Sequence, residues 1–299
     1  MPRLRPHLGP QRGCRAPLGI ARGRSLAPLA FSPDAGYITG QVLALDAGLT
    51  AYWVWSTRRM GDTIETLIKT IRRDGFAFFR APAMRKTLEK AGLADWGRFA
   101  ASWDDLGVDT YMADGGRYRR RRFAAFRATR EAVSRKPHQP HYQSRDYNAL
   151  NGGIERWFEP VTDTIGTHPA LRAILDTCRD LFDRLTPERV RPASWHVEIH
   201  QFRIEARTGA AGKPTPEGMH RDGVDWVLVL LVNRINIASG ETSIHDLGKN
   251  ELGSFTLIDP LDAAFTDDNR VYHGVTPVSP LDPARPGHRD VLVVTFRRE

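Results

Sequence analysis

The stretch TPEGMHRDGVDWVLVLLV, residues 215–232, joins a polar loop to a long apolar run. The run from Asp225 to Val232 is almost unbroken in large and β-branched side chains, which predicts a fully buried strand. The loop before it contains His220-Arg221-Asp222. Side chains two residues apart on an extended segment point the same way, so this imidazole and this carboxylate can reach a single ion.

Further strand patterns flank this stretch and are separated by clusters of Gly, Pro, Asn and Asp. We expect strands at 195–204, 241–245, 254–258, 270–273 and 289–297. Upstream, apolar residues recur at helical spacing in 62–73, 82–91, 93–103 and 170–185, with a short strand at 76–79 and a weaker strand pattern at 118–128. Helices followed by roughly seven or eight strands favour an α+β fold with a β-sandwich or jelly-roll core.

A second His-x-Asp triplet stands at 288–290, but only the first triplet is followed by a distant histidine, His273. Iron(II) oxygenases bind their metal through two imidazoles and one carboxylate on one face, and the opposite face stays open for ligands. We therefore expect His220, Asp222 and His273 to hold iron.

Arg289 opens the last predicted strand, beyond His273 in the chain. A guanidinium at this place can clamp the distal carboxylate of 2-oxoglutarate through two parallel hydrogen bonds. Taken alone, Arg289 could equally be a surface arginine at a strand edge, and the interpretation depends on the metal-binding pattern beside it.

Several segments together carry a family resemblance: HQFRI (200–204), TPEGMHRDGVDWV (215–227), SGETSIHD (239–246), VYHGVTPV (271–278) and GHRDVLVVTF (287–296), with YRRRRF (118–123) and YNALNGGIERWFEP (147–160) upstream. They resemble the bacterial 2-oxoglutarate/Fe(II)-dependent dioxygenases that include the L-isoleucine hydroxylase and related free amino-acid hydroxylases. The resemblance covers most of residues 60–299 and implies a double-stranded β-helix (jelly-roll, cupin-like) core with N-terminal helices packed outside. The chain departs from the wider superfamily at Val291, where Ser or Thr is common, so another group must assist the 2-oxoglutarate carboxylate.

The resemblance implies an enzyme that hydroxylates a C–H bond of a small polar substrate, with a free L-amino acid as the first candidate. Its cofactor would be Fe(II), with 2-oxoglutarate and O2 as cosubstrates. Three alternatives stay open: a desaturase, cyclase or sulfoxidase of the same fold acting on a specialised metabolite, a non-catalytic jelly-roll binding protein, and an oxygenase that modifies nucleic acid or protein. Halogenation is disfavoured because Asp222 retains the carboxylate that a halogenase removes.

Other residues are weaker candidates. Thr242 is a candidate for contact with the cofactor, although a structural strand threonine fits as well. Tyr147, Asn148 and Arg156 lie in a polar, Gly-rich segment that could close over a substrate, or that forms a cap-and-turn cluster. Arg156 could pair with the carboxylate of an amino acid. His200 either points into the pocket or is a satisfied core histidine.

Charge and composition exclude other classes. The net charge is +8, but residues 1–59 hold eight arginines against two acids and so carry +6 of it. The body of the chain is nearly neutral, and we expect no nucleic-acid partner. The arginines at 117 and 119–122 are expected on a solvated strand face, with one turned inward. No apolar run is long enough to span a membrane, and two cysteines, Cys14 and Cys178, are typical of a cytoplasmic protein.

Residues 1–59 are expected to form a disordered tail or a non-native N-terminal extension, ahead of a dioxygenase domain at 60–299. Within them, AGYITGQVLALDAGLTA (35–51) resembles the C-terminal end of short-chain dehydrogenases, but the Gly-rich and Tyr-x-x-x-Lys motifs of that family are missing. The hypothesis is that this segment comes from a neighbouring reading frame or from a start codon assigned too early, with Met60 as the authentic start.

Overall fold

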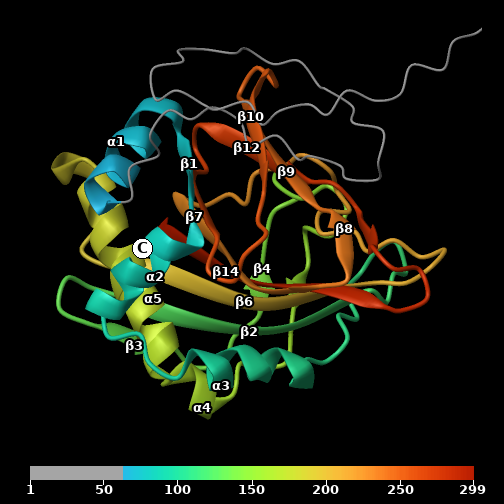
Figure 1. Cartoon of the computed structure of the whole chain (residues 1–299). Coiled ribbons are helices and arrows are strands. Elements are labelled where there is room, and N and C mark those ends of the chain that lie inside the picture. Colours follow the sequence, from blue (N-terminus) through green and yellow to red (C-terminus); the bar gives the residue numbers. More distant parts are fainter. Residues whose placement is uncertain (1–62) are drawn as a thin grey trace, which may run out of the picture. The chain divides into compact units, whose positions relative to one another are not determined.

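The computed structural model describes residues 63–299 (Figure 1). The expected N-terminal extension, the segment that resembles short-chain dehydrogenases and the proposed start at Met60 lie outside the described residues. These three expectations stay predictions.

Helices come first in the described chain and strands follow, as the sequence pattern indicates. The helices are α1 (Ile64–Asp74), α2 (Ala81–Lys90), α3 (Trp96–Ala101), α4 (Asp163–Gly166) and α5 (Pro169–Leu185), with 3-10 turns at Ser102–Asp105 and Glu188–Val190. The strands are β1 (Phe76–Phe79), β2 (Arg119–Ala128), β3 (Val133–Arg135), β4 (His141–Tyr142), β5 (Glu155–Arg156), β6 (Trp195–Ala206), β7 (Trp226–Ile235), β8 (Ile237–Ser239), β9 (Glu241–Asp246), β10 (Glu251–Thr256), β11 (Ala263–Asp267), β12 (Val271–Val275), β13 (Val278–Pro280) and β14 (Gly287–Arg298).

The largest sheet is antiparallel and has the strand order β1-β11-β7-β14-β6-β2-β3. One face of this sheet packs against α1, α2 and α5, which gather on one side of it in Figure 1. Phe182 of α5 stacks on Trp226 of β7 with ring centroids 5.5 Å apart. The apolar stripe of α5 therefore buries the outer face of the sheet.

The other face of the large sheet turns toward a smaller sheet with the order β10-β9-β12. Leu231, Ala264 and Val291 from the large sheet pack there with Leu257 and the half-buried Phe255. Strand alternation sends Leu292 and Val294 of β14 toward the helices and Val291 toward this interior. Arg289 shares the inward parity of Val291. The two facing sheets form a jelly roll with helices outside, so the predicted fold class is confirmed.

The structure differs from the sequence expectation in several short elements. Nine strands, β6 to β14, follow Pro192 in place of the seven or eight expected. The helix expected at 93–103 is divided into α3 and a 3-10 turn, and the loop expected at 137–142 ends in β4. Within the described part of the chain, no helix is both long and apolar enough to cross a membrane.

Candidate metal centre

A backbone bridge brings the two outer residues of the expected metal triad together. His220 and His273 exchange two N–H···O bonds of 2.9 Å as an isolated antiparallel bridge. His273 lies on β12, which pairs with β9 at Ile244. The two imidazole rings consequently lie side by side, with centroids 4.5 Å apart and planes inclined by 56°.

Asp222 completes the cluster. Its Oδ1 is 3.5 Å from Nε2 of His220 and its Oδ2 is 3.6 Å from Nε2 of His273. One ligand atom from each of the three residues lies within 4.8 Å of the other two. Two imidazoles and one carboxylate thus converge on one point, although His220 and His273 are 53 positions apart in the chain.

The protonation of the cluster suits a divalent cation. Burial opposes ionisation of Asp222, but its hydrogen bond to His220 and the charges of both imidazoles hold the pKa of this carboxyl below its ordinary value. Burial and the neighbouring His220 lower the pKa of His273 to about 4, so this imidazole is neutral and has a free lone pair. Burial also works against a charged His220, yet Asp222 raises the pKa of His220 to about 9. A metal ion would displace that proton.

The hydrogen bonds around the cluster orient the imidazoles. Nδ1 of His220 lies 3.1 Å from the carbonyl oxygen of Gly218, and as the donor it leaves Nε2 for the metal. The carboxylate of Asp268 accepts hydrogen bonds from the backbone N–H groups of Asp222, Gly223 and Val224 at 2.7 to 3.0 Å. This buried carboxylate fixes the loop that carries Asp222, a role that the sequence did not signal.

Arg289 faces the interior with part of its hydrogen-bonding capacity unused. The residue is 2% exposed, and its Nε and Nη2 atoms are buried without a hydrogen-bond partner in residues 63–299. Burial and the nearby Arg234 lower the pKa of Arg289 to about 10, so it still carries its charge at neutral pH. A buried guanidinium with free donors is stabilised by a carboxylate that can take both. This environment fits the distal carboxylate of 2-oxoglutarate.

A small cavity lies between the two sheets beside the metal cluster. It has a volume of about 30 Å³, and its lining includes Thr242, Thr266 and His273, with the remaining wall formed by Val229, Ile244, Ala264 and Val275. The hydroxyl of Thr266 is buried and has no partner among the described residues. Thr242 therefore lines the same cavity as His273, one of the candidate metal ligands. Its contact with a cofactor stays a prediction.

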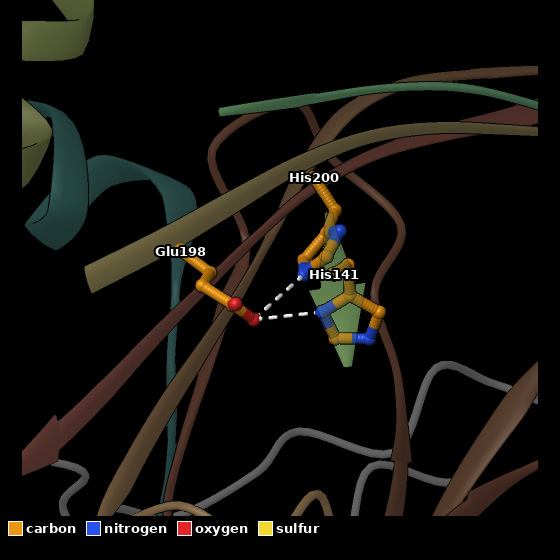
Figure 2. Close-up of side chains that lie close together, drawn as sticks. All are labelled: His141, Glu198 and His200. Carbon is orange, nitrogen blue, oxygen red and sulfur yellow. Dashed lines mark hydrogen bonds and ion pairs between the residues drawn. The ribbon is translucent and has the colours of Figure 1, made fainter. Parts of the chain in front are cut away.

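A second group of two imidazoles and one carboxylate lies on the same inner face of the large sheet, shown in Figure 2. Oε2 of Glu198 is 2.9 Å from Nδ1 of His141 and 3.7 Å from Nε2 of His200. Its Oε1 is 3.2 Å from Nε2 of His196. By spacing alone this group could also hold an ion.

The surroundings of the second group argue against a metal there. Nη2 of Arg121 lies 2.5 Å from Nδ1 of His200. A guanidinium can only donate, so Nδ1 accepts and the proton of His200 sits on Nε2, facing Glu198. Burial and nearby charges, including Arg121, lower the pKa of His200 to about 3. The imidazole is neutral, its Nε2–H faces Glu198 at 3.7 Å, and it has no lone pair left for a metal.

The arginine-rich strand β2 supplies this buried network. Arg119 and Arg121 are 6% and 4% exposed, whereas one inward arginine was expected on a solvated face. Arg119 pairs with the buried Asp109 at 2.7 Å. Arg121 stacks over the ring of Phe158 at 3.5 Å from its centroid. Two of these arginines are therefore buried in place of the one expected, because alternate residues of β2 point to the jelly-roll interior, while Arg117 is exposed and Arg120 and Arg122 are half-buried.

The remaining candidate substrate residues, Tyr147, Asn148, Arg156 and His200, have different surroundings. Asn148 donates to Oε1 of Gln143 and accepts from the backbone N–H of Asn151, so its amide organises the loop between β4 and β5. Tyr147 packs on the metal loop, where a Cβ added at Gly223, whose φ is +80°, would come within 2.6 Å of the tyrosine ring. Arg156 is 2% exposed and its Nε has no hydrogen-bond partner in the described chain. His200 belongs to the second group described above.

The family comparison agrees with this geometry. The family model described as 2OG-Fe dioxygenase matches residues 100–295, so the chain belongs to the 2OG-Fe dioxygenase family. The family uses Fe(II), 2-oxoglutarate and O2, and the predicted cofactors and family resemblance are confirmed. The exact roles of individual residues stay predictions.

Individual relatives are similar over part of their length. L-isoleucine-4-hydroxylase from Bacillus thuringiensis is 27% identical over 157 residues, which are 52% of this chain and 64% of that protein. 3(1)-hydroxy-L-isoleucine 4-dioxygenase from Pantoea ananatis (strain AJ13355) is 25% identical over 161 residues, 53% of this chain and 64% of that protein. The matches thus span less than two thirds of these curated relatives. The crystal structure of a bsmA homolog from Methylobium petroleophilum PM1 is 37% identical, covers 79% of this chain and 93% of its own, and has a TM-score of 0.70.

Proposed function

We propose that this chain is an Fe(II)- and 2-oxoglutarate-dependent dioxygenase that hydroxylates a C–H bond of a free L-amino acid. The observation that carries the proposal is a pair of buried guanidiniums, Arg289 and Arg156, each with a buried donor that has no hydrogen-bond partner among the described residues. One carboxylate, from 2-oxoglutarate, can satisfy only one of them. The second calls for an anionic substrate, and the names of the curated relatives support an amino acid.

The roles of the residues follow from their chemistry. His220, Asp222 and His273 would hold Fe(II), and Arg289 would hold the distal carboxylate of 2-oxoglutarate. When bound, the metal and cosubstrate supply the oxidation of the C–H bond, with 2-oxoglutarate consumed to succinate and CO2. The aliphatic walls of the cavity beside His273 would exclude water from the candidate metal centre.

Arg156 would orient the substrate through its carboxylate. Three acidic groups, Asp109, Glu217 and Glu198, lie close enough for their charges to raise the pKa of Arg156, while burial, as the largest effect, lowers it. None of them forms an ion pair with Arg156: Asp109 is taken by Arg119 and Glu198 by His141. A substrate carboxylate would supply the missing partner and hold the reacting carbon at a fixed distance from the metal.

The test is succinate formation from 2-oxoglutarate under air. The protein, purified anaerobically and reconstituted with Fe(II) and ascorbate, is screened against the free L-amino acids beside His220→Ala. We expect succinate to rise with one or a few amino acids and not with the variant. No rise with any amino acid, by a protein that binds Fe(II) and 2-oxoglutarate, would keep the family chemistry and reject the free amino acid as substrate.

A further inference from the structure

The loop between β4 and β5, residues 143–154, is joined to the candidate metal centre by a glutamine. Gln143 is buried, and its Nε2 donates a hydrogen bond of 3.1 Å to the backbone carbonyl of Asp222. The backbone N–H of Asp222 donates to the carboxylate of Asp268 at 2.8 Å. Side chains from two distant parts of the chain therefore hold both polar backbone groups of a candidate metal ligand.

Gln143 also holds its own loop together. Its Oε1 accepts a hydrogen bond from Nδ2 of Asn148 at 3.1 Å, and its backbone carbonyl accepts one from the N–H of Gly153 at 2.8 Å. Oδ1 of Asn148 accepts from the N–H of Asn151 at 2.7 Å, and these two asparagines are 5% and 4% exposed. Buried amides that bond at both ends make a network that resists local change. A displacement of the loop therefore moves the amide of Gln143 and, through it, the backbone of Asp222.

A tyrosine and an arginine make a second connection between the loop and the metal centre. The guanidinium carbon of Arg221, the middle residue of the His-x-Asp motif, lies 5.4 Å from the ring centroid of Tyr147 and 5.3 Å from that of Tyr272. A cation within about 6 Å of a ring centroid is attracted by the ring. Tyr147 belongs to the loop, and Tyr272 directly precedes His273. The loop is thus connected to both segments that carry the candidate ligands.

The far end of the loop leads to the proposed substrate side. Gly153 is followed by β5, whose Arg156 is buried and pairs across the hairpin with His141 of β4. Arg156 is the residue proposed above to hold the carboxylate of the substrate. One short loop therefore lies between this arginine and the backbone of Asp222.

We propose that Gln143 is a positioning residue that couples the loop 143–154 to the metal centre. It fixes the backbone of Asp222, so the closed loop and the bound metal stabilise each other. This inference rests on the part of the proposed function that makes Asp222 a metal ligand. Because coupling between two sites is reciprocal, metal binding orders the loop, and loss of the hydrogen bond from Gln143 weakens metal binding.

Hydrogen–deuterium exchange of the whole wild-type protein tests the first half of this coupling. The probe is Co(II), which stands in for Fe(II), is stable in air and has a visible absorption that depends on coordination geometry. We expect Co(II) to slow exchange at the amides of Asn148, Gly152 and Gly153, which donate hydrogen bonds within the loop. The exposed turn 247–250 between β9 and β10 is the internal control, and its exchange should not change. This measurement requires no variant.

Two glutamine variants test the second half. Gln143→Met keeps the length of the side chain and removes its donor. We expect the dissociation constant for Co(II) to rise roughly 10- to 100-fold, the range for loss of a residue that supports a metal ligand. The visible spectrum of bound Co(II) should change, and the slower exchange in the loop should be lost. Gln201→Met is the matched control, because Gln201 is 1% exposed and donates to Oγ of Ser102 at 2.8 Å. Its Co(II) affinity and spectrum should stay at the wild-type values.

The outcomes separate the coupling from the proposed function. Co(II) that binds the wild-type protein without slowing exchange in the loop overturns the coupling, whether or not the variants fold. Gln143→Met that binds Co(II) as tightly as Gln201→Met, with the wild-type spectrum, also overturns it. Both results leave the proposed function in place. A wild-type protein that binds neither Co(II) nor Fe(II) overturns both.

Discussion

Two groups of two imidazoles and one carboxylate face the same jelly-roll interior and differ in what surrounds them. In the first, His273 is neutral and its Nδ1 has no partner in the described chain, and His220 exposes Nε2 toward Asp222. In the second, Arg121 donates a hydrogen bond to Nδ1 of His200. The carboxylate of Glu198 faces ring nitrogens of His141 and His200 (Figure 2). The same side chains make a candidate metal centre in one place and a hydrogen-bond network in the other.

The difference teaches that the neighbours of a histidine decide whether its lone pair is available. A basic side chain that donates to Nδ1 forces the proton onto Nε2 and removes that atom as a ligand. A carbonyl oxygen at Nδ1, as Gly218 provides for His220, has the opposite effect. Ligand spacing alone does not separate the two groups, because both satisfy it.

The largest expected effect separates the groups directly. His220→Ala removes a candidate imidazole ligand, and we expect iron binding and 2-oxoglutarate turnover to fall by at least about a hundredfold. Loss of a residue that only hydrogen-bonds a metal ligand costs up to about a hundredfold, and loss of the ligand itself should cost more. Glu198→Gln should retain one iron per chain and most of its 2-oxoglutarate turnover. Iron content by colorimetric assay checks both, and a Glu198→Gln protein that loses its iron would reverse the assignment.

Arg289 gives the next largest effect, on the cosubstrate and not on the metal. Arg289→Gln removes a buried cation from a charged pair, and we expect the KM for 2-oxoglutarate to rise roughly 30-fold or more. Iron content should not change. Arg297→Gln, an exposed position on the same strand β14, is the control. A KM that stays within twofold of wild type would assign the carboxylate to another residue.

The second group should matter for stability. Glu198 accepts from His141 at 2.9 Å and from His196 at 3.2 Å, and Glu198→Gln replaces a charged acceptor in a buried site. We expect the free energy of unfolding in urea to fall by about 1–3 kcal/mol. Glu205→Gln on the same strand breaks a partly exposed pair with Arg120 and should cost less than about 1 kcal/mol. An equal decrease in the free energy of unfolding for both variants would show that the buried network stabilises the fold no more than an exposed ion pair does.

Much of this arrangement was predictable from the sequence, and the rest depends on contacts between distant residues. His-x-Asp and a later histidine indicated the candidate metal ligands, because this motif is short and its chemistry is known. Strand β11, Ala263–Asp267, escaped prediction because its alanines and aspartate lack strand propensity. The bond between Arg121 and His200 joins residues 79 positions apart, and no local pattern announces it.

The smallest effect concerns pH. The pKa of His200 is lowered to about 3 in the fold, against an ordinary value near 6.5, so between these values the unfolded chain binds more protons. The free energy of unfolding of the metal-free protein should therefore fall as pH drops below about 6.5, by up to about 1.4 kcal/mol per unit from this residue. His200→Gln should make the free energy of unfolding less dependent on pH between pH 6.5 and 5, by up to about 1.4 kcal/mol per pH unit, which corresponds to one bound proton. An unchanged slope would mean that His200 titrates normally in the folded protein.

The most direct test of the difference between the two groups is anomalous X-ray diffraction at the iron edge, from crystals grown anaerobically with Fe(II) and 2-oxoglutarate. We predict one iron peak per chain, between His220, Asp222 and His273, with the distal carboxylate of 2-oxoglutarate at Arg289. A peak between His141, Glu198 and His200, or none at the first group, would contradict the account.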